Sequence, residues 1–217
     1  MHRRRTAIAV SAALVAAPVL TACGGTEHPG TAAVVGGDRI TVAQLEGRVK
    51  EVRTAQRSAT PDDTRYQQTL ARTSSLTRDT LHSMVLDRVL DRAAEDAGVS
   101  VTRRDVGRLR AGLEQQAGGA TALKAVWLDQ YGVAPRRIDD NLRTEVEAQK
   151  LAAALGADMN TADGKATFWK AMAQASEELN IDLNPRYGTW DVQKSSRADT
   201  KTPWVKEVTT AGERQAA

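Results

Sequence analysis

The sequence predicts a mainly α-helical bundle with one small β pairing, and three observations lead to that fold class. Charged residues make up 26% of the chain and aromatic residues only 4%, so the core must be built from leucine, valine and alanine, which is typical of helices. Apolar residues recur at helical spacing over most of the chain. β-Favouring residues cluster only around Ala33–Val35 and after Asn184. We therefore expect one domain, which a chain of 217 residues can form after a leader is removed.

The first 23 residues have the pattern of an export signal. Three arginines at Arg3–Arg5 precede the almost entirely apolar run Ala7–Leu20, and small residues then lead to Cys23. This order predicts a secretory signal peptide over residues 1–22, with an apolar run shorter than the roughly 20 residues that span a bilayer. The stretch ending on Cys23 resembles the lipobox of bacterial lipoproteins. The resemblance implies that the Cys23 thiol carries a diacylglyceryl group, with acyl chains such as palmitate, and becomes the first mature residue.

Cys23 is the only cysteine, so its use for lipid leaves no thiol for a disulfide, a metal or a nucleophile. Two acyl chains are enough for stable anchoring, and we expect the protein on the extracytoplasmic face of the cell membrane. A plain signal peptide with a chance or buried cysteine is the alternative. Arg4–Arg5 also permits twin-arginine export, although the surrounding residues favour the Sec route.

The net charge argues against nucleic acid as a partner. The chain has 30 basic and 27 acidic residues, but three arginines and no acid lie within residues 1–22. The mature chain therefore has 27 of each, and it lacks the basic excess that is typical of nucleic-acid-binding domains.

The N-terminal part is predicted to contain a spacer, a short hairpin and a helix. Residues 23–32 form the lipidated cysteine and a flexible spacer rich in glycine. Ala33–Val35 is a strand candidate, and the turn residues after it lead back into a brief second strand that ends at Ile40. Thr41 is the expected N-cap of the next helix, because Gln44 stands three residues later and completes a capping box.

Three more helical segments follow a loop over residues 58–64. Residues 65–97 have helical periodicity, with a break predicted around Ser74 and Ser75. Thr102 and Asp105 have capping-box spacing and predict the start of the next helix, which two glycines end. A short helix through Leu123–Tyr131 comes next.

The last part is predicted to hold two long helices, a strand and a tail. Pro135 suits the first turn of a long helix, and residues 162–180 form another. Arg186–Val192 has alternating β-favouring residues and predicts a strand. The folded domain is expected over residues 33–193, and residues 194–217 are polar and expected to be disordered.

The residues that usually carry catalysis or metal are sparse. His2 belongs to the leader, His28 to the spacer, and His82 stands alone on a helix, so we interpret it as a surface or boundary histidine. There is no cysteine pair or histidine–carboxylate cluster for a metal, no nucleophile elbow and no phosphate-binding glycine loop. Asp139–Asp140 and the acids at 145 and 147 lie among arginines and are interpreted as a solvated face. We therefore expect no cofactor, no metal and no enzymatic activity.

A client-binding groove is the site hypothesis that the apolar residues support. Two predicted helices carry aromatic and aliphatic residues that would suit a surface for extended segments. The alternative for the second helix is plain packing onto the core. The candidate groove residues are Leu123, Val126, Trp127, Tyr131, Phe168, Trp169 and Met172.

The stretch from Ala33 to Leu151 resembles the N-terminal domain of SurA-type periplasmic chaperones, which extracytoplasmic foldase lipoproteins share. Four features carry the resemblance: a valine strand, turn and Ile-Thr before a helix; a helix, Gly-Val-Ser-Val-Thr and a new helix; a short helix ending in Tyr-Gly-Val before a long one; and the C-terminal segment. These are the stretches Ala33–Thr41, Leu86–Thr102, Leu128–Val133 and Asn184–Asp191.

The resemblance implies a SurA-type helical bundle in which a late segment returns to pair with the N-terminal strand, here Tyr187–Val192 with Ala33–Val35. Family members that isomerise prolyl bonds insert a parvulin domain before that segment. Residues 152–183 leave room only for a helix, and the parvulin histidines and glycine-rich motifs are missing. Prolyl isomerase activity is therefore not carried over.

Three functional hypotheses remain. The first is a lipid-anchored chaperone that binds non-native exported proteins without isomerising prolines. The second is a structural lipoprotein that docks one specific partner in the cell envelope. The third, an enzyme, has no residues in its favour, and a fold alone does not determine function.

Overall fold

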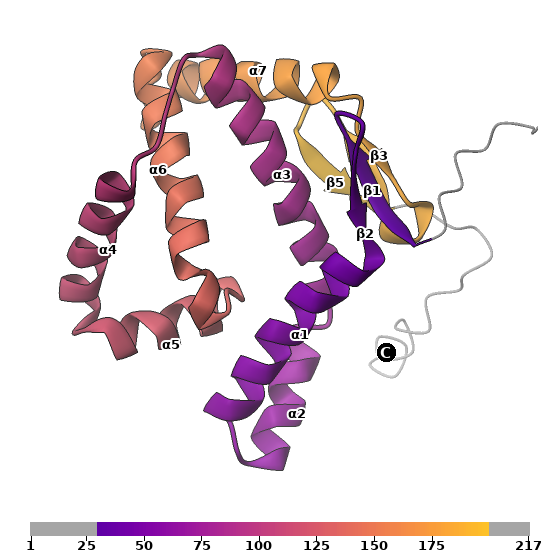
Figure 1. Cartoon of the computed structure of the whole chain (residues 1–217), viewed down its shortest axis with the longest axis vertical. Coiled ribbons are helices and arrows are strands. Elements are labelled where there is room, and N and C mark those ends of the chain that lie inside the picture. The colour runs from indigo at the N-terminus through magenta and orange to yellow at the C-terminus, as the bar shows by residue number, and fades with distance from the viewer. Residues whose placement is uncertain (1–29, 200–217) are drawn as a thin grey trace, which may run out of the picture.

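The computed structural model describes residues 30–199, and this part contains seven α-helices and five short strands (Figure 1). The prediction of a mainly helical fold is confirmed. The helices are α1 Val42–Ala59, α2 Asp63–Arg72, α3 Leu76–Asp96, α4 Arg103–Ala117, α5 Ala120–Tyr131, α6 Ile138–Ala154 and α7 Ala162–Glu178. The strands are β1 Thr31–Val35, β2 Asp38–Thr41, β3 Asp182–Leu183, β4 Thr189–Asp191 and β5 Ser196–Ala198, and the 3₁₀ turns are η1 Pro135–Arg137 and η2 Pro185–Tyr187.

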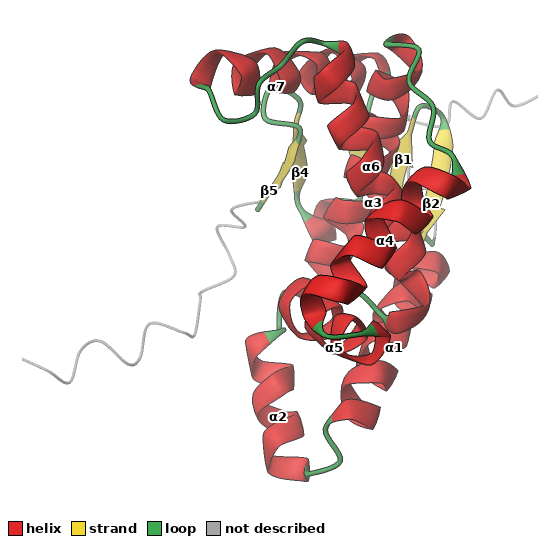
Figure 2. Ribbon diagram, turned by 90° about the vertical axis from the view of Figure 1, so that its left-hand side faces the viewer, coloured by secondary structure: helices red, strands yellow, loops and turns green. Residues whose placement is uncertain are grey.

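The long helix α3 is the centre of the fold. It packs against α1, α6, α7 and strand β1, while α4 and α5 reach the rest of the molecule mainly through α6, α1 and each other. Figure 1 shows α4, α5 and α6 forming an arm on one side of α3 and the sheet lying on the other. The α1–α2 hairpin extends below these layers in Figure 2. Among residues 30–199, no helix is long and apolar enough to cross a membrane.

Local signals position the helix ends as predicted. Thr41 and Gln44 form both bonds of a capping box at the start of α1, and Thr102 and Asp105 do the same for α4. Each box satisfies backbone N–H groups that the first helical turn leaves without a partner. The predicted break is also present, since α2 ends at Arg72 and α3 begins at Leu76.

The three-stranded sheet confirms that a late segment pairs with the N-terminal strand, and it corrects which segment does so. Its strand order is β2-β1-β3, and the late strand β3 runs antiparallel to β1. The pairing of Tyr187–Val192 with β1 is wrong, because β3 (Asp182–Leu183) takes that place and Thr189–Asp191 pairs with β5 instead. The Asn184 N–H donates to the carbonyl of Ala32, and the chain then turns into η2 at Pro185, which cannot donate a ladder hydrogen bond.

Ordered structure extends beyond both predicted ends of the domain. Thr31 and Ala32 were expected in the spacer, but they belong to β1 and are buried. Ser196–Ala198 was expected in the disordered tail, but it forms β5. The predicted signal peptide, Cys23 and residues 200–217 lie outside the described residues.

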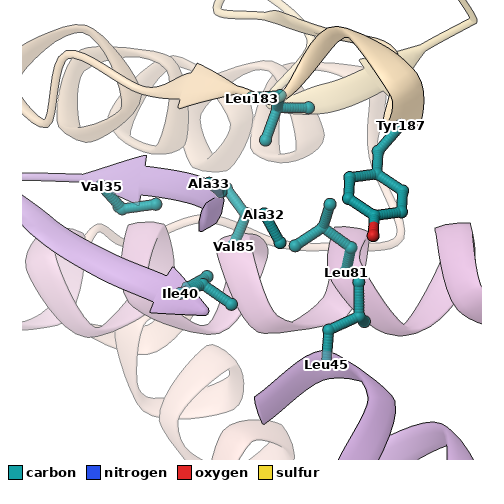
Figure 3. Packing of buried hydrophobic residues seen from close by; sticks show 9 residues of the cluster. All are labelled: Ala32, Ala33, Val35, Ile40, Leu45, Leu81, Val85, Leu183 and Tyr187. Carbon is teal, nitrogen blue, oxygen red and sulfur yellow. The ribbon is translucent and has the colours of Figure 1, made fainter. Parts of the chain in front are cut away.

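The core begins where the sheet packs on α3 and α1. Figure 3 shows nine side chains of this cluster, with Leu81 and Val85 of α3 beneath the strands and Tyr187 closing one end. A second cluster continues it between α3, α6 and α7, and includes Phe168 and Met172.

His82 lies at the edge of the first cluster, half-buried, with its ring centroid 5.6 Å from that of Trp190. It is the boundary histidine that the sequence predicted, and burial lowers its pKa.

Candidate functional site

The predicted groove residues do not form one groove. Four of them lie on α5 and three on α7, and Figure 1 shows these helices at opposite ends of α6. Leu123 is buried with Ile138 and Leu142, while Phe168 and Met172 are buried in the second core cluster. For Phe168 and Met172 the alternative of plain core packing holds, and Leu123, for which no such alternative was given, is a core residue as well.

The remaining candidates are partly or fully accessible. Val126 and Trp127 are half-buried, and the Trp127 indole N–H donates to the Asn141 side-chain oxygen at 2.9 Å. Tyr131 is 61% exposed, with its ring centroid 5.2 Å from that of Trp127. Trp169 is 43% exposed on α7 and packs edge-on against Phe168. Tyr131 is therefore the most accessible of the aromatic candidates.

A charged cleft of about 600 Å³ lies between α1, α3 and α6. The sequence analysis did not predict it. Its walls carry both signs of charge, with small side chains on α1 and Met84 of α3 among them. The charged residues that line it are Arg48, Glu51, Asp87, Arg88, Asp91, Arg137, Asp140 and Arg143.

A second hollow, the α2–α5 cleft, has a volume of about 780 Å³ and is lined by the end of α1, by α2, by the start of α3 and by α5. Tyr131 stands in its wall. A smaller cavity of about 140 Å³ shares Tyr131 and Leu76 with this cleft and Asp87 and Arg48 with the charged cleft. We term the three neighbouring hollows together the hollow surface; Tyr131 lines the smaller cavity and the α2–α5 cleft.

One wall of this surface is fixed by ion pairs that we term the Glu51 clasp, made of Glu51, Arg136 and Arg137. The Arg137 Nε donates to Glu51 Oε2 at 3.0 Å, and Arg136 pairs with the same carboxylate. Arg137 also reaches Asp140 at 2.9 Å. The hydrogen bond from Arg136, with further support from Arg137, lowers the pKa of Glu51 to about 2 although burial opposes the charge. The clasp therefore ties α1 to the start of α6 as a charged network.

Asp87 and Asp91 line the charged cleft, and together with the buried Glu147 they form a group that we term the α3–α6 acid cluster. Burial raises the pKa of Asp87 to about 6, against the attraction of Arg48. The Thr144 hydroxyl donates to Asp87 at 3.4 Å. Burial also raises the pKa of Glu147, and its hydrogen bond with Asp91 adds to the effect.

Glu147 corrects a prediction made from the sequence. We expected it on a solvated face, but it is only 5% exposed, whereas Asp139, Asp140 and Glu145 are exposed as predicted. No pattern within α6 signals this burial, because Glu147 follows Arg143 at the spacing of a surface ion pair. Within residues 30–199, no group of three or more side chains has the arrangement of a metal site.

The comparisons with known proteins agree with this architecture. A family model described as "SurA-like N-terminal domain" matches residues 1–152. The chain belongs to the SurA-like N-terminal domain family. The match confirms the resemblance seen in the sequence, and it includes α1, α3 and α6, the helices around the charged cleft of this SurA-like domain. No curated protein and no solved structure matches the chain.

Proposed function

We propose that the protein is a membrane-anchored, extracytoplasmic chaperone-like lipoprotein that binds non-native segments of exported proteins and does not isomerise prolines. The family is one of chaperone-type domains, which supports the general role. The observation that carries the proposal is the hollow surface, whose smaller cavity and α2–α5 cleft are both lined by the exposed Tyr131.

The hollow surface suits extended polypeptide better than a compact ligand. The charged cleft offers guanidinium donors and carboxylate acceptors on facing walls, and Ala43 and Gly47 of α1 leave room for a second backbone. Tyr131 adds an amphipathic ring that makes a large contact at a small cost in side-chain entropy. A surface of this kind accepts many sequences, because main-chain groups and one aromatic contact supply the binding.

Lipid on Cys23 would hold the domain near the membrane. Thr31, the first residue of β1, follows Cys23 by eight positions, and an extended chain over eight positions spans roughly 28 Å at most. Emerging exported proteins would then meet the domain close to the bilayer. Metabolic labelling with a radioactive fatty acid tests this part, since Cys23→Ser should abolish the label.

Aggregation suppression tests the binding role. We expect the chain from residue 24 onward to reduce light scattering of a chemically unfolded client at stoichiometric ratios. Tyr131→Ala should weaken this suppression several-fold, while Trp169→Ala is the matched control, because it removes an exposed aromatic away from the hollow surface. Circular dichroism checks that both variants fold.

Two results would change the proposal. No suppression by the unaltered chain at several-fold excess, together with one stoichiometric partner in a pull-down, would favour the scaffolding lipoprotein. Turnover of a proline peptide above the uncatalysed rate would contradict the absence of isomerase activity.

A further inference from the structure

The α3–α6 acid cluster places more carboxyl groups than cationic side chains at the interface between α3 and α6. The Glu147 side chain of α6 is 7% exposed and faces Asp91 of α3. A single guanidinium, that of Arg143, reaches both acids, at 3.6 Å from Glu147 and 3.7 Å from Asp91. One helical turn earlier, Asp87 has only the Thr144 hydroxyl within hydrogen-bond distance. Asp91 and Glu147 therefore share one partly exposed cation, and within residues 30–199 no cation forms an ion pair with Asp87.

Other charged groups around the cluster have partners elsewhere. From η1, Arg137 binds Glu51 and Asp140. On α6, Lys150 binds Asp105 of α4 at 2.6 Å. On α3, Arg92 binds Glu178 from the end of α7, and the Arg88 guanidinium donates to the carbonyl of Asp38. From α1, Arg48 attracts Asp87 without reaching it as an ion pair.

Two carboxyl groups that face each other in this way cannot both ionise without a penalty. When one of them holds a proton, the pair shares a hydrogen bond across the interface. When both lose their protons, they repel each other in a site that solvates them poorly. The raised pKa values of Asp87 and Glu147 place this change between mildly acidic and neutral pH.

We propose that Asp87, Asp91 and Glu147 form a proton-operated latch between α3 and α6. In its protonated state the latch holds α6 against α3 and keeps the charged cleft narrow. In its ionised state it loosens the arm of α4, α5 and α6, and the cleft widens because Asp87, Asp91 and Arg143 line it. The arm then remains tied to α3 by the second core cluster, in which Leu151 of α6 packs with Val89 of α3. It remains tied to α1 by the Glu51 clasp and by the small cluster around Val52 and Leu128.

Electron-spin distance measurements test the latch without a client, so its failure and the failure of the proposed function are distinguishable. Because Cys23 is the only cysteine, the chain from residue 23 onward carrying Cys23→Ser accepts two labels at chosen sites. Lys50→Cys on α1 and Gln149→Cys on α6 are both exposed. We expect a shift to longer distances between the labels from pH 5 to pH 8.

The variants decide whether this cluster causes the shift. Glu147→Gln combined with Asp87→Asn keeps the hydrogen-bonding shape without the charge, so the short distance should persist at pH 8. Glu145→Gln is the matched control on the exposed face of α6 and should still show the shift. His82→Gln should show it too, since His82 faces Trp190 and not α6.

Three outcomes would overturn the latch. The first is an equal distance at both pH values in the unaltered protein. The second is an undiminished shift in the double variant. The third is loss of the shift in His82→Gln, which would assign the pH dependence to the histidine. Circular dichroism at both pH values shows whether each variant has kept its helices.

Discussion

The Glu51 clasp and the α3–α6 acid cluster place the same kind of group on two walls of one cleft, with opposite results. Glu51 and Asp87 are both shielded from water, yet the pKa of Glu51 lies at about 2 and that of Asp87 at about 6. Two guanidinium groups donate to Glu51, whereas Asp87 has one hydroxyl within reach. The comparison teaches that burial opposes the charged form at both places, that two arginine partners outweigh it at Glu51, and that no partner outweighs it at Asp87.

The two regions therefore respond to pH in opposite directions. Folding lowers the pKa of Glu51 from 4.5, so its contribution to stability is present above that value and is lost as the pH falls towards 2. Folding raises the pKa of Asp87 from 3.8 to about 6, so stability is lost as the pH rises through this interval. The balance favours mildly acidic conditions, in which the clasp is charged and the cluster still holds protons.

Removing the clasp has the largest expected effect. Glu51→Gln leaves the guanidinium groups of Arg136 and Arg137 without their shared carboxylate, which has a side chain only 13% exposed. We expect the free energy of unfolding at pH 7 to fall by about 2 kcal/mol, since one arginine remains well solvated and limits the loss. Urea denaturation measures the change.

Exposed Glu46 on the same helix supplies the control for the clasp, because Glu46→Gln removes an acid without a cation at ion-pair distance. The difference between the two variants should disappear near pH 2, where Glu51 takes up a proton in the unaltered protein as well. Equal stability of the two variants at pH 7 would show that the clasp contributes nothing.

Neutralising the cluster has a smaller effect of the opposite sign. Asp87→Asn removes the cost of a buried charge, so we expect the free energy of unfolding to rise by about 1 kcal/mol at pH 8. The gain should shrink as the pH falls towards 4, where Asp87 in the folded protein is already protonated. Denaturant midpoints at both pH values measure this, with exposed Asp129→Asn as the control. A loss of stability at pH 8 would contradict the raised pKa.

Local patterns predicted the helices well, because their signals lie within a few residues of each other. The capping boxes at Thr41 and Thr102 required only a polar side chain three residues ahead of its partner. The third strand of the sheet had no such signal. β3 is two residues long, too short for an alternating pattern, and its partner β1 lies about 150 residues earlier in the chain. The alternating pattern of Tyr187–Val192 therefore predicted that this segment, and not Asp182–Leu183, pairs with β1.

For the candidate site, local sequence patterns were even less able to predict contacts between distant parts of the chain. Helical spacing identified apolar residues on α5 and α7, but it gave no information on which of them other helices cover. In the structure, other helices cover Leu123 and Met172, which are core residues, and leave Tyr131 exposed. Glu147 follows Arg143 by four residues, a spacing typical of a surface ion pair. Only the packing of α6 against α3 buries it, and no pattern within α6 encodes that contact.

The smallest expected effect in the comparison of Glu51 with Asp87 comes from removing the hydroxyl that hydrogen-bonds Asp87. Thr144→Val removes a hydroxyl that donates to Asp87 at 3.4 Å and leaves the side-chain volume almost unchanged. Because so long a hydrogen bond contributes no more than about 0.7 kcal/mol, we expect the pKa of Asp87 to rise by about half a pH unit. Carbon-detected NMR of the Asp87 carboxyl measures it, with Thr167→Val on α7 as the control. A pKa that stays constant in Thr144→Val would mean that burial and neighbouring charges alone set the behaviour of this wall. The contrast with Glu51 would then rest on its guanidinium partners and not on hydrogen bonding in general.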